Sequence, residues 1–240
     1  MTNALLFAAI VIFSSFILIG FLLFKEVRTH LFWRKLVADG DFAAINGILM
    51  GEIDRWRTQR PPKGTSAAVW AGVQGMELLA GSAQFVYIST TAEAEFRVVG
   101  AKRVQVATAY DTAVSTVSKL TEMLLYDVPN LRPDFIRVDV YTTFRDEGGA
   151  APAARPILSS LADRALAAPV DWDWSDPHEI VAAFDLTSRI SDAGEALPVE
   201  LPRIPPQFEA SLPDSEPVEP AAAAGVGTPN GNPPDSGTRP

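Results

Sequence analysis

The chain has 240 residues, 48% of them hydrophobic, and carries 29 acidic against 20 basic side chains for a formal net charge of −9. This acidic balance argues against nucleic acid as a partner, because neutralising phosphates requires a basic surface. The sequence contains no cysteine, which excludes disulfides, cysteine nucleophiles, iron–sulfur clusters and thiolate zinc sites.

The charge is unevenly distributed along the chain. From Lys25 to Lys63 eight basic residues stand against five acids, whereas from Ser191 to Pro240 eight acids stand against two arginines. A basic segment next to an apolar N-terminus and an acidic segment far downstream suit a protein held at a membrane surface that bears anionic lipid.

Residues 4–24 form an apolar run of 21 positions without a charge. At 1.5 Å per residue, such a helix measures roughly 30 Å, the thickness of a hydrocarbon core. A cleaved signal peptide has a basic start, a shorter apolar run and a cleavage sequence of small residues. Neither Met1-Thr2-Asn3 nor Phe24-Lys25-Glu26 fits that pattern, so we predict a single transmembrane helix at residues 4–24.

The residues after this run determine the predicted orientation. Basic side chains follow the apolar run and none precedes it, so the positive-inside rule places the rest of the chain in the cytoplasm and residues 1–3 outside the cell membrane. Aromatic side chains interleave with these charges, as they do at a membrane interface. The predicted membrane-interface residues are Lys25, Arg28, Phe32, Trp33, Arg34 and Lys35.

The segment after residue 38 begins with an amphipathic helix. Asp39-Gly40-Asp41 is a helix-start signal, and apolar residues follow at steps of three and four until Pro61-Pro62. The apolar stripe comprises Phe42, Ile45, Leu49, Ile53 and Trp56. The spacing therefore predicts a helix from residue 42 to about residue 58.

The next segments predict strands. Residues 73–79 alternate in polarity, and although they also fit one face of a helix, Gly81-Ser82 as a two-residue hairpin turn favours a strand. Residues 84–91, 95–99 and 102–106 are rich in β-branched or alternating residues, with Gly100-Ala101 as a second turn. Together these segments predict an antiparallel meander with one solvated face.

The second half of the domain begins with the most regular helix pattern, at residues 108–126, which Thr108 caps and Asp111 supports in the first turn. Residues 135–144 predict a long strand and residues 157–162 its partner. Asp176-Pro177 opens a last helix that runs to about residue 184. From residue 191 onward, prolines, alanines and acids predict a disordered tail.

The predicted fold class is therefore α+β. A transmembrane helix (4–24) and a basic juxtamembrane segment (25–38) precede a soluble domain (39–190), in which an antiparallel sheet of about five strands carries helices on one face. The disordered tail takes up residues 191–240.

The densest group of chemically active side chains lies between Asp171 and Glu179. Asp171, Asp173, His178 and Glu179 are candidate metal ligands or acid–base groups, but their spacing fits neither a calcium loop nor a zinc helix. Capping of the last helix by Asp176 and Glu179, with Trp172 and Trp174 packed at a corner, accounts for these residues without a ligand. We favour this structural interpretation.

Arg137, Asp139 and Tyr141 share one face of the long strand. They form either a site on the sheet or, as we favour, a cross-strand ion pair on a solvated face. The sequence contains no nucleophile-elbow motif and no glycine-rich phosphate loop. We therefore predict no catalytic residue and no cofactor.

The functional prediction follows from these observations. The anchor, the basic segment, the acidic tail and the poverty of catalytic motifs predict a membrane-anchored cytoplasmic binding or assembly module, with the lipid bilayer and a protein as partners. The alternative is a membrane-anchored metal-dependent hydrolase that uses the Asp171–Glu179 cluster.

Overall fold

The computed structural model describes the backbone of residues 2–144 and 152–212, and the side chains of the same residues except 2–12, 26, 30, 210 and 211. The helices are α1 (Thr2–Ala38), α2 (Phe42–Thr58), α3 (Ala67–Gln74), α4 (Ala109–Glu122), α5 (Arg164–Ala167) and α6 (Pro177–Ala182), with a π-helical turn η1 (Met123–Asp127) and a 3₁₀ turn η2 (Pro206–Ser211). The strands are β1 (Glu77–Gly81), β2 (Phe85–Thr91), β3 (Glu95–Val99), β4 (Lys102–Ala107), β5 (Phe135–Phe144), β6 (Ala153–Asp163) and β7 (Asp185–Ser188).

The fold is α+β, as predicted, but the five-stranded sheet is mixed rather than antiparallel. Its strand order is β1-β2-β5-β6-β7, and β2 pairs with β5 in parallel. The prediction of an antiparallel sheet is wrong because the chain between β2 and β5 makes a long crossover that contains α4, and such a crossover returns a strand in the parallel direction. The other three pairings are antiparallel.

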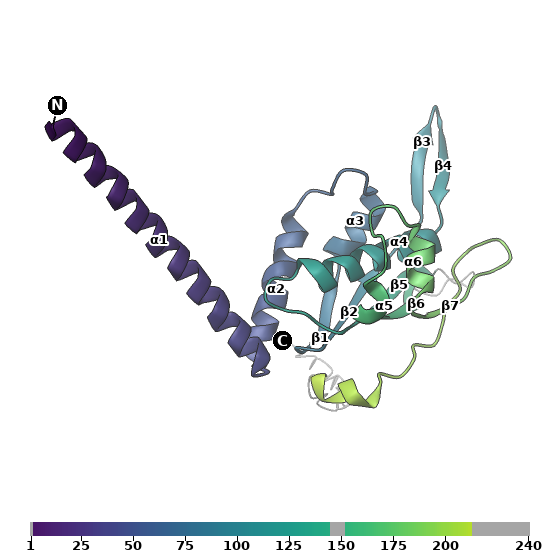
Figure 1. Ribbon diagram of the computed structural model, residues 1–240. Coiled ribbons are helices and arrows are strands. Elements are labelled where there is room, and N and C mark those ends of the chain that lie inside the picture. The colour runs from purple at the N-terminus through teal and green to yellow at the C-terminus, as the bar shows by residue number, and fades with distance from the viewer. Residues whose placement is uncertain (1, 145–151, 213–240) are drawn as a thin grey trace, which may run out of the picture.

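Strands β3 and β4 form a separate two-stranded ribbon rather than part of the predicted meander. Their bounds and the turn at Gly100 agree with the sequence pattern, and Gly100 has the left-handed φ of 64° that a tight turn requires. Figure 1 shows the ribbon projecting from the domain, clear of the five-stranded sheet. The five-stranded sheet instead acquires β7, which we did not predict.

Helices α2, α3, α4 and α6 cover one face of the sheet, as predicted (Figure 1). Asp41 caps α2 by accepting a hydrogen bond from the Ala44 amide at 3.0 Å. The predicted stripe of α2 is buried from Ile45 to Trp56, whereas Phe42 at its start stays 54% exposed. This face holds the main hydrophobic core of the protein.

The strand predicted at residues 73–79 is wrong in its first half, because α3 occupies residues 67–74 and β1 starts only at Glu77. Ser66 caps α3 by accepting from the Val69 amide. Gly72 lets α3 approach α4 closely, since a Cβ at this position would lie 2.7 Å from Thr116 Cγ2. Tertiary packing against α4 therefore determines the helical state of this short segment.

The opposite face of the sheet is covered by the segment 197–212. Phe208 is 4% exposed, and its ring stacks on Phe85 at a centroid distance of 4.3 Å. Ile204 and Leu212 pack against the same apolar patch. The predicted disorder from residue 191 is therefore wrong for residues 191–212, because apolar side chains among the prolines find this patch; residues 213–240 lie outside the described residues.

The predicted transmembrane segment finds no support in the part of the chain that the structure describes. Helix α1 runs without interruption from Thr2 to Ala38, but no helix within the described residues has a stretch long and apolar enough to cross a bilayer. The described side chains of α1 begin at Phe13, so residues 4–12 of the predicted segment lie outside them.

Candidate functional site

A polar groove lies between the loop before α3, the exposed side of α4 and the segment before α6. It encloses about 680 Å³, which is within the usual range of ligand sites. Four acids and two lysines line it, together with serine and threonine hydroxyls. The charged lining residues are Lys63, Glu95, Asp111, Lys119, Glu122 and Asp173.

The floor of this groove is formed by α4. Lys119 donates to Glu122 at 2.6 Å, so this lysine is held on the helix surface by its own neighbour. Thr112 also lines the groove and is 2% exposed. Its Oγ1 atom is buried without a hydrogen-bond partner among the described residues. Such a buried hydroxyl without a hydrogen-bond partner carries a desolvation cost.

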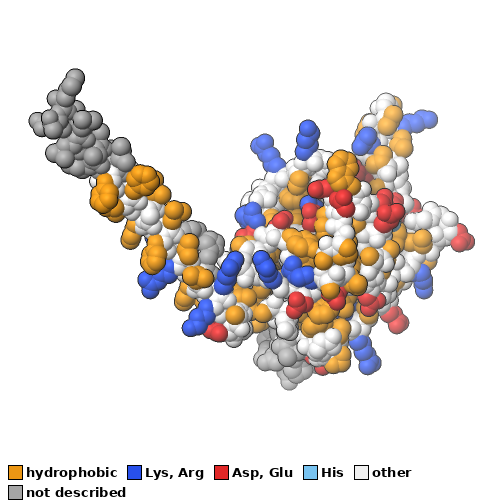
Figure 2. Space-filling view, viewed as in Figure 1, with side chains coloured by type: hydrophobic (Ala, Val, Ile, Leu, Met, Phe, Trp, Pro, Cys, Tyr) orange, Lys and Arg blue, Asp and Glu red, His pale blue; other side chains and the backbone are white. Residues whose placement is uncertain are grey.

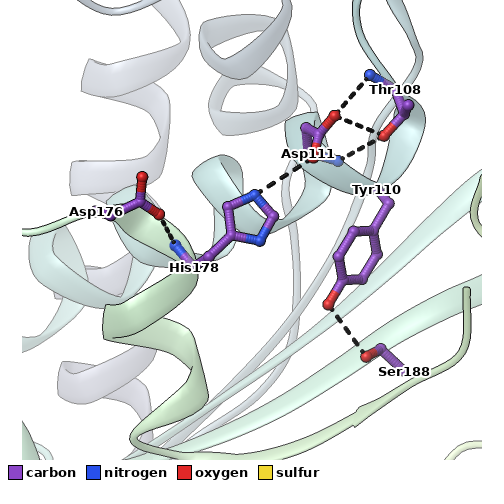
Figure 3. A network of polar contacts seen from close by, with 6 residues as sticks. All are labelled: Thr108, Tyr110, Asp111, Asp176, His178 and Ser188. Carbon is purple, nitrogen blue, oxygen red and sulfur yellow. Dashed lines mark hydrogen bonds and ion pairs between the residues drawn. The ribbon is translucent and has the colours of Figure 1, made fainter. Parts of the chain in front are cut away.

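Asp111, which lines the groove, points toward His178 (Figure 3). The Oδ1 atom of Asp111 lies 3.3 Å from His178 Nε2. Asp111 also completes a capping box, because its Oδ2 atom accepts from the Thr108 amide at 3.0 Å and from the Thr108 hydroxyl at 2.8 Å. The ring of Tyr110 lies beside the imidazole, at a centroid distance of 5.8 Å.

The environment of Asp111 favours its charged form. Burial acts to raise the pKa of Asp111, but the hydrogen bonds from Thr108 and the charge of His178 outweigh it, and the pKa is lowered. Asp111 is therefore a carboxylate at neutral pH. Because both Asp111 and His178 are nearly half exposed, solvent screens their pairing.

The predicted cluster from Asp171 to Glu179 does not converge. Asp171 accepts from the amide of Asp173 at 3.3 Å in a local turn, whereas His178 points toward Asp111 on another element. Glu179 lies exposed in the first turn of α6. Within residues 2–144 and 152–212 no group of three or more potential metal-ligating side chains occurs.

The interpretation that these residues cap a helix and pack at a corner, without a ligand, is correct for Asp176 and Trp172. Asp176 caps α6 by accepting from the His178 amide at 2.7 Å. Trp172 packs against Tyr126 and Phe184, at centroid distances of 6.0 and 6.5 Å. Trp174, which we predicted to pack at the same corner, is 88% exposed instead.

Arg137 and Asp139 form an ion pair, but they lie in one strand and are buried rather than cross-strand and solvated. Arg137 is 3% exposed and Asp139 is fully buried. The carboxylate also accepts from Tyr87 and from Ser159, each at 2.6 Å. Burial and the bond to Asp139 raise the pKa of Tyr87, which therefore stays a donor. Because both oxygens of Asp139 are hydrogen-bonded within the sheet, we interpret this network as structural.

The predicted membrane-interface residues lie on the last turns of α1. Phe32 is 58% exposed and Trp33 is 36% exposed, and their rings meet edge to face at 6.0 Å. Figure 2 shows basic side chains gathered toward the end of α1 nearest the domain, with apolar side chains farther along it.

The fold and the groove define an α+β domain with a mixed five-stranded sheet and a long N-terminal helix. Neither protein-family models, nor curated proteins, nor solved structures offer a match to this chain.

Proposed function

We propose that the protein is a membrane-tethered binding module whose domain docks a protein partner. The proposal that the domain docks a protein partner rests on the exposed β3–β4 ribbon beside the groove. Its large apolar side chains stay in water: Phe96 at 43%, Val98 at 73%, Val99 at 60%, Val104 at 44% and Val106 at 46% exposed. Exposed apolar surface of this kind is typical of interaction sites.

The ribbon and the groove form one surface, because Glu95 and Ala107 at the base of the ribbon also line the groove. The ribbon carries three basic residues and one acid, whereas the groove carries four acids and two lysines. A partner segment with an apolar centre and charges of both signs would match it.

The proposed tether rests on the composition of residues 4–24 and on the exposure of their described side chains. The run 4–24 contains no charge, and its described apolar side chains stay exposed, from Phe13 at 68% to Phe24 at 66%. Burying such side chains in lipid is favourable by roughly 25 cal/mol per Å². The basic residues that follow favour a cytoplasmic domain by the positive-inside rule.

A photo-crosslinking experiment tests the docking surface. We expect a benzoylphenylalanine at Val98 in the full chain to give one discrete adduct in cells, which disappears when Ser115→Trp fills the groove. The matched control carries the same probe at Gln207, an exposed residue of η2. An adduct that persists in Ser115→Trp, or that forms equally at Gln207, would contradict a docking surface made by ribbon and groove.

A further inference from the structure

A second cavity lies at the base of α1, between its last turn and the loop that follows η1. It encloses about 830 Å³. Three arginines line it from three separate elements: Arg34 on α1, Arg132 in the loop and Arg164 at the start of α5. None of the described residues that line it is acidic.

Arg164 is fixed in place by the fold. Its Nε atom donates to the Pro133 carbonyl at 2.8 Å and its Nη2 atom donates to the Leu125 carbonyl at 2.6 Å. Its guanidinium lies 5.4 Å from the centre of the Tyr126 ring. A guanidinium has five N–H donors, so this arrangement leaves the arginine further donors for a ligand.

The cavity concentrates positive charge, because three arginines and no acid are found among its described lining residues. Burial lowers the pKa of Arg164; Tyr126 and Asp134 act to raise it, and the charge of Arg132 adds the smallest influence, a lowering one. An anion in this cavity would gain a favourable Coulomb interaction with each guanidinium group. Planar guanidinium groups match the oxygens of a phosphate in a bidentate manner.

The rest of the lining indicates the size and nature of the ligand. Apolar residues Val37, Leu125, Val128 and Leu131 share the cavity with the arginines. The volume exceeds what a bare phosphate needs and suits a phosphate attached to a larger group. An apolar floor below a basic rim fits a phosphate monoester with a carbon skeleton.

We propose that this cavity, at the base of α1, binds a phosphate monoester through Arg34, Arg132 and Arg164. The phosphate comes either from a phospholipid headgroup or from a soluble metabolite. The lipid source rests on the proposed tether, because only a bilayer at α1 brings headgroups to the cavity; the soluble source does not depend on it.

Two arms distinguish the sources. The first titrates the full chain in detergent with glycerol 3-phosphate and follows binding by calorimetry, which needs no bilayer. The second reconstitutes the chain in phosphatidylcholine vesicles that contain spin-labelled phosphatidic acid or spin-labelled phosphatidylcholine, and measures the immobilised fraction of each lipid. Phosphatidic acid bears the same monoester group on a lipid.

We expect saturable binding in at least one arm, reduced about tenfold or more by Arg132→Gln and by Arg34→Gln, since each loses charge-assisted hydrogen bonds. Both side chains are exposed and have room to change without disturbing the core. Arg203→Gln, an exposed arginine of the segment 197–212, is the matched control and should bind like the native chain.

Several results would overturn the proposal. Equal losses of binding in Arg132→Gln and Arg203→Gln would show that binding depends only on the net charge of the protein. Binding in neither arm would remove the site altogether. If the vesicle arm fails because the chain does not enter vesicles, the proposed tether fails, whereas saturation with glycerol 3-phosphate would still support the site.

Discussion

Asp139 is a fully buried carboxylate whose two oxygens accept four hydrogen bonds, two from Arg137 and one each from Tyr87 and Ser159. Arg137 lies at 3.1 Å in the same strand and also packs over the Tyr87 ring at 4.9 Å. Burying two charges is unfavourable unless all their bonds are made. The stability of this site therefore depends on the charge balance within the pair.

Removing one charge of the Arg137–Asp139 pair should lower the free energy of unfolding more than removing both charges. Asp139→Leu leaves Arg137 buried without its partner, and we expect the free energy of unfolding to fall by about 3–5 kcal/mol. Arg137→Leu with Asp139→Leu removes both charges and should recover much of that loss. Urea denaturation of the three proteins measures the difference; a double variant as unstable as Asp139→Leu would show that shape rather than charge dominates.

Asp111 should make stability depend on pH in the acid range. Its pKa is lower in the folded chain than in the unfolded one, so its contribution is fully present above the unfolded value of about 3.9 and is lost as the pH falls through the folded value. We expect Asp111→Asn to lower stability by less than about 1 kcal/mol at neutral pH, because solvent screens the exposed pair.

The same difference should shrink as the pH falls below about 4. Urea denaturation at several pH values measures it. Thr108→Val, which removes the hydroxyl that donates to Asp111, should weaken the same pH dependence. A loss of stability in Asp111→Asn that stays constant down to pH 2 would mean that the carboxylate makes no pH-dependent contribution.

At the scale of elements, two glycines give opposite expectations for the same substitution. A Cβ at Gly72 would lie 2.7 Å from Thr116 Cγ2 and 3.1 Å from the Thr91 carbonyl, whereas a Cβ at Gly51 on α2 would meet nothing within 4 Å. We expect Gly72→Ala to destabilise by about 1–3 kcal/mol through overpacking. Gly51→Ala should stabilise by about 0.5–1 kcal/mol through helix propensity.

Thermal and urea denaturation of both glycine variants check this prediction, with each variant serving as the control for the other. Equal effects at the two positions would contradict the close approach of α3 and α4. Helix α2, which contains Gly51, was predictable because its apolar stripe faces one core. The period of the apolar residues in the sequence is therefore enough to describe it.

Elements defined by long-range partners were not predictable in the same way. The segment 67–74 is too short for its period to decide between helix and strand, and its packing on α4 decides. Phe208 lies among prolines, and nothing local signals that Phe85 and Phe135 provide its partners. The parallel pairing of β2 and β5 likewise depends on the crossover between them.

The candidate sites show the same limit. Asp111 and His178 were each recognisable as residues near a helix start, but only the packing of α4 against α6 makes them a pair. The three arginines of the second cavity come from three separate elements. Local motifs therefore predicted caps and turns, whereas the surfaces that we propose for binding are assembled by tertiary structure.

At the scale of the whole molecule, the domain lies at one end of the long helix α1. Figure 1 shows α1 leaving the domain as a single extended helix, and the β3–β4 ribbon projecting at another point of the domain. With a tether on α1, the arginine cavity is the proposed site that lies at the base of the tethering helix. The proposed functions therefore depend on which side of the membrane the domain occupies.

The orientation can be measured with a single introduced thiol, because the native chain has no cysteine. We expect Gln207→Cys to react with a membrane-impermeant maleimide only after cells are permeabilised, as the positive-inside rule predicts for a domain that follows basic residues after an apolar run. Replacing Lys25, Arg28, Arg34 and Lys35 with glutamine, and Thr2 and Asn3 with lysine, moves the positive charge to the other side. The thiol should then react in intact cells. Labelling of Gln207→Cys in intact cells, without the charge replacements, would show that the proposed orientation is inverted. Recovery of the chain in the supernatant after ultracentrifugation would contradict the tether itself.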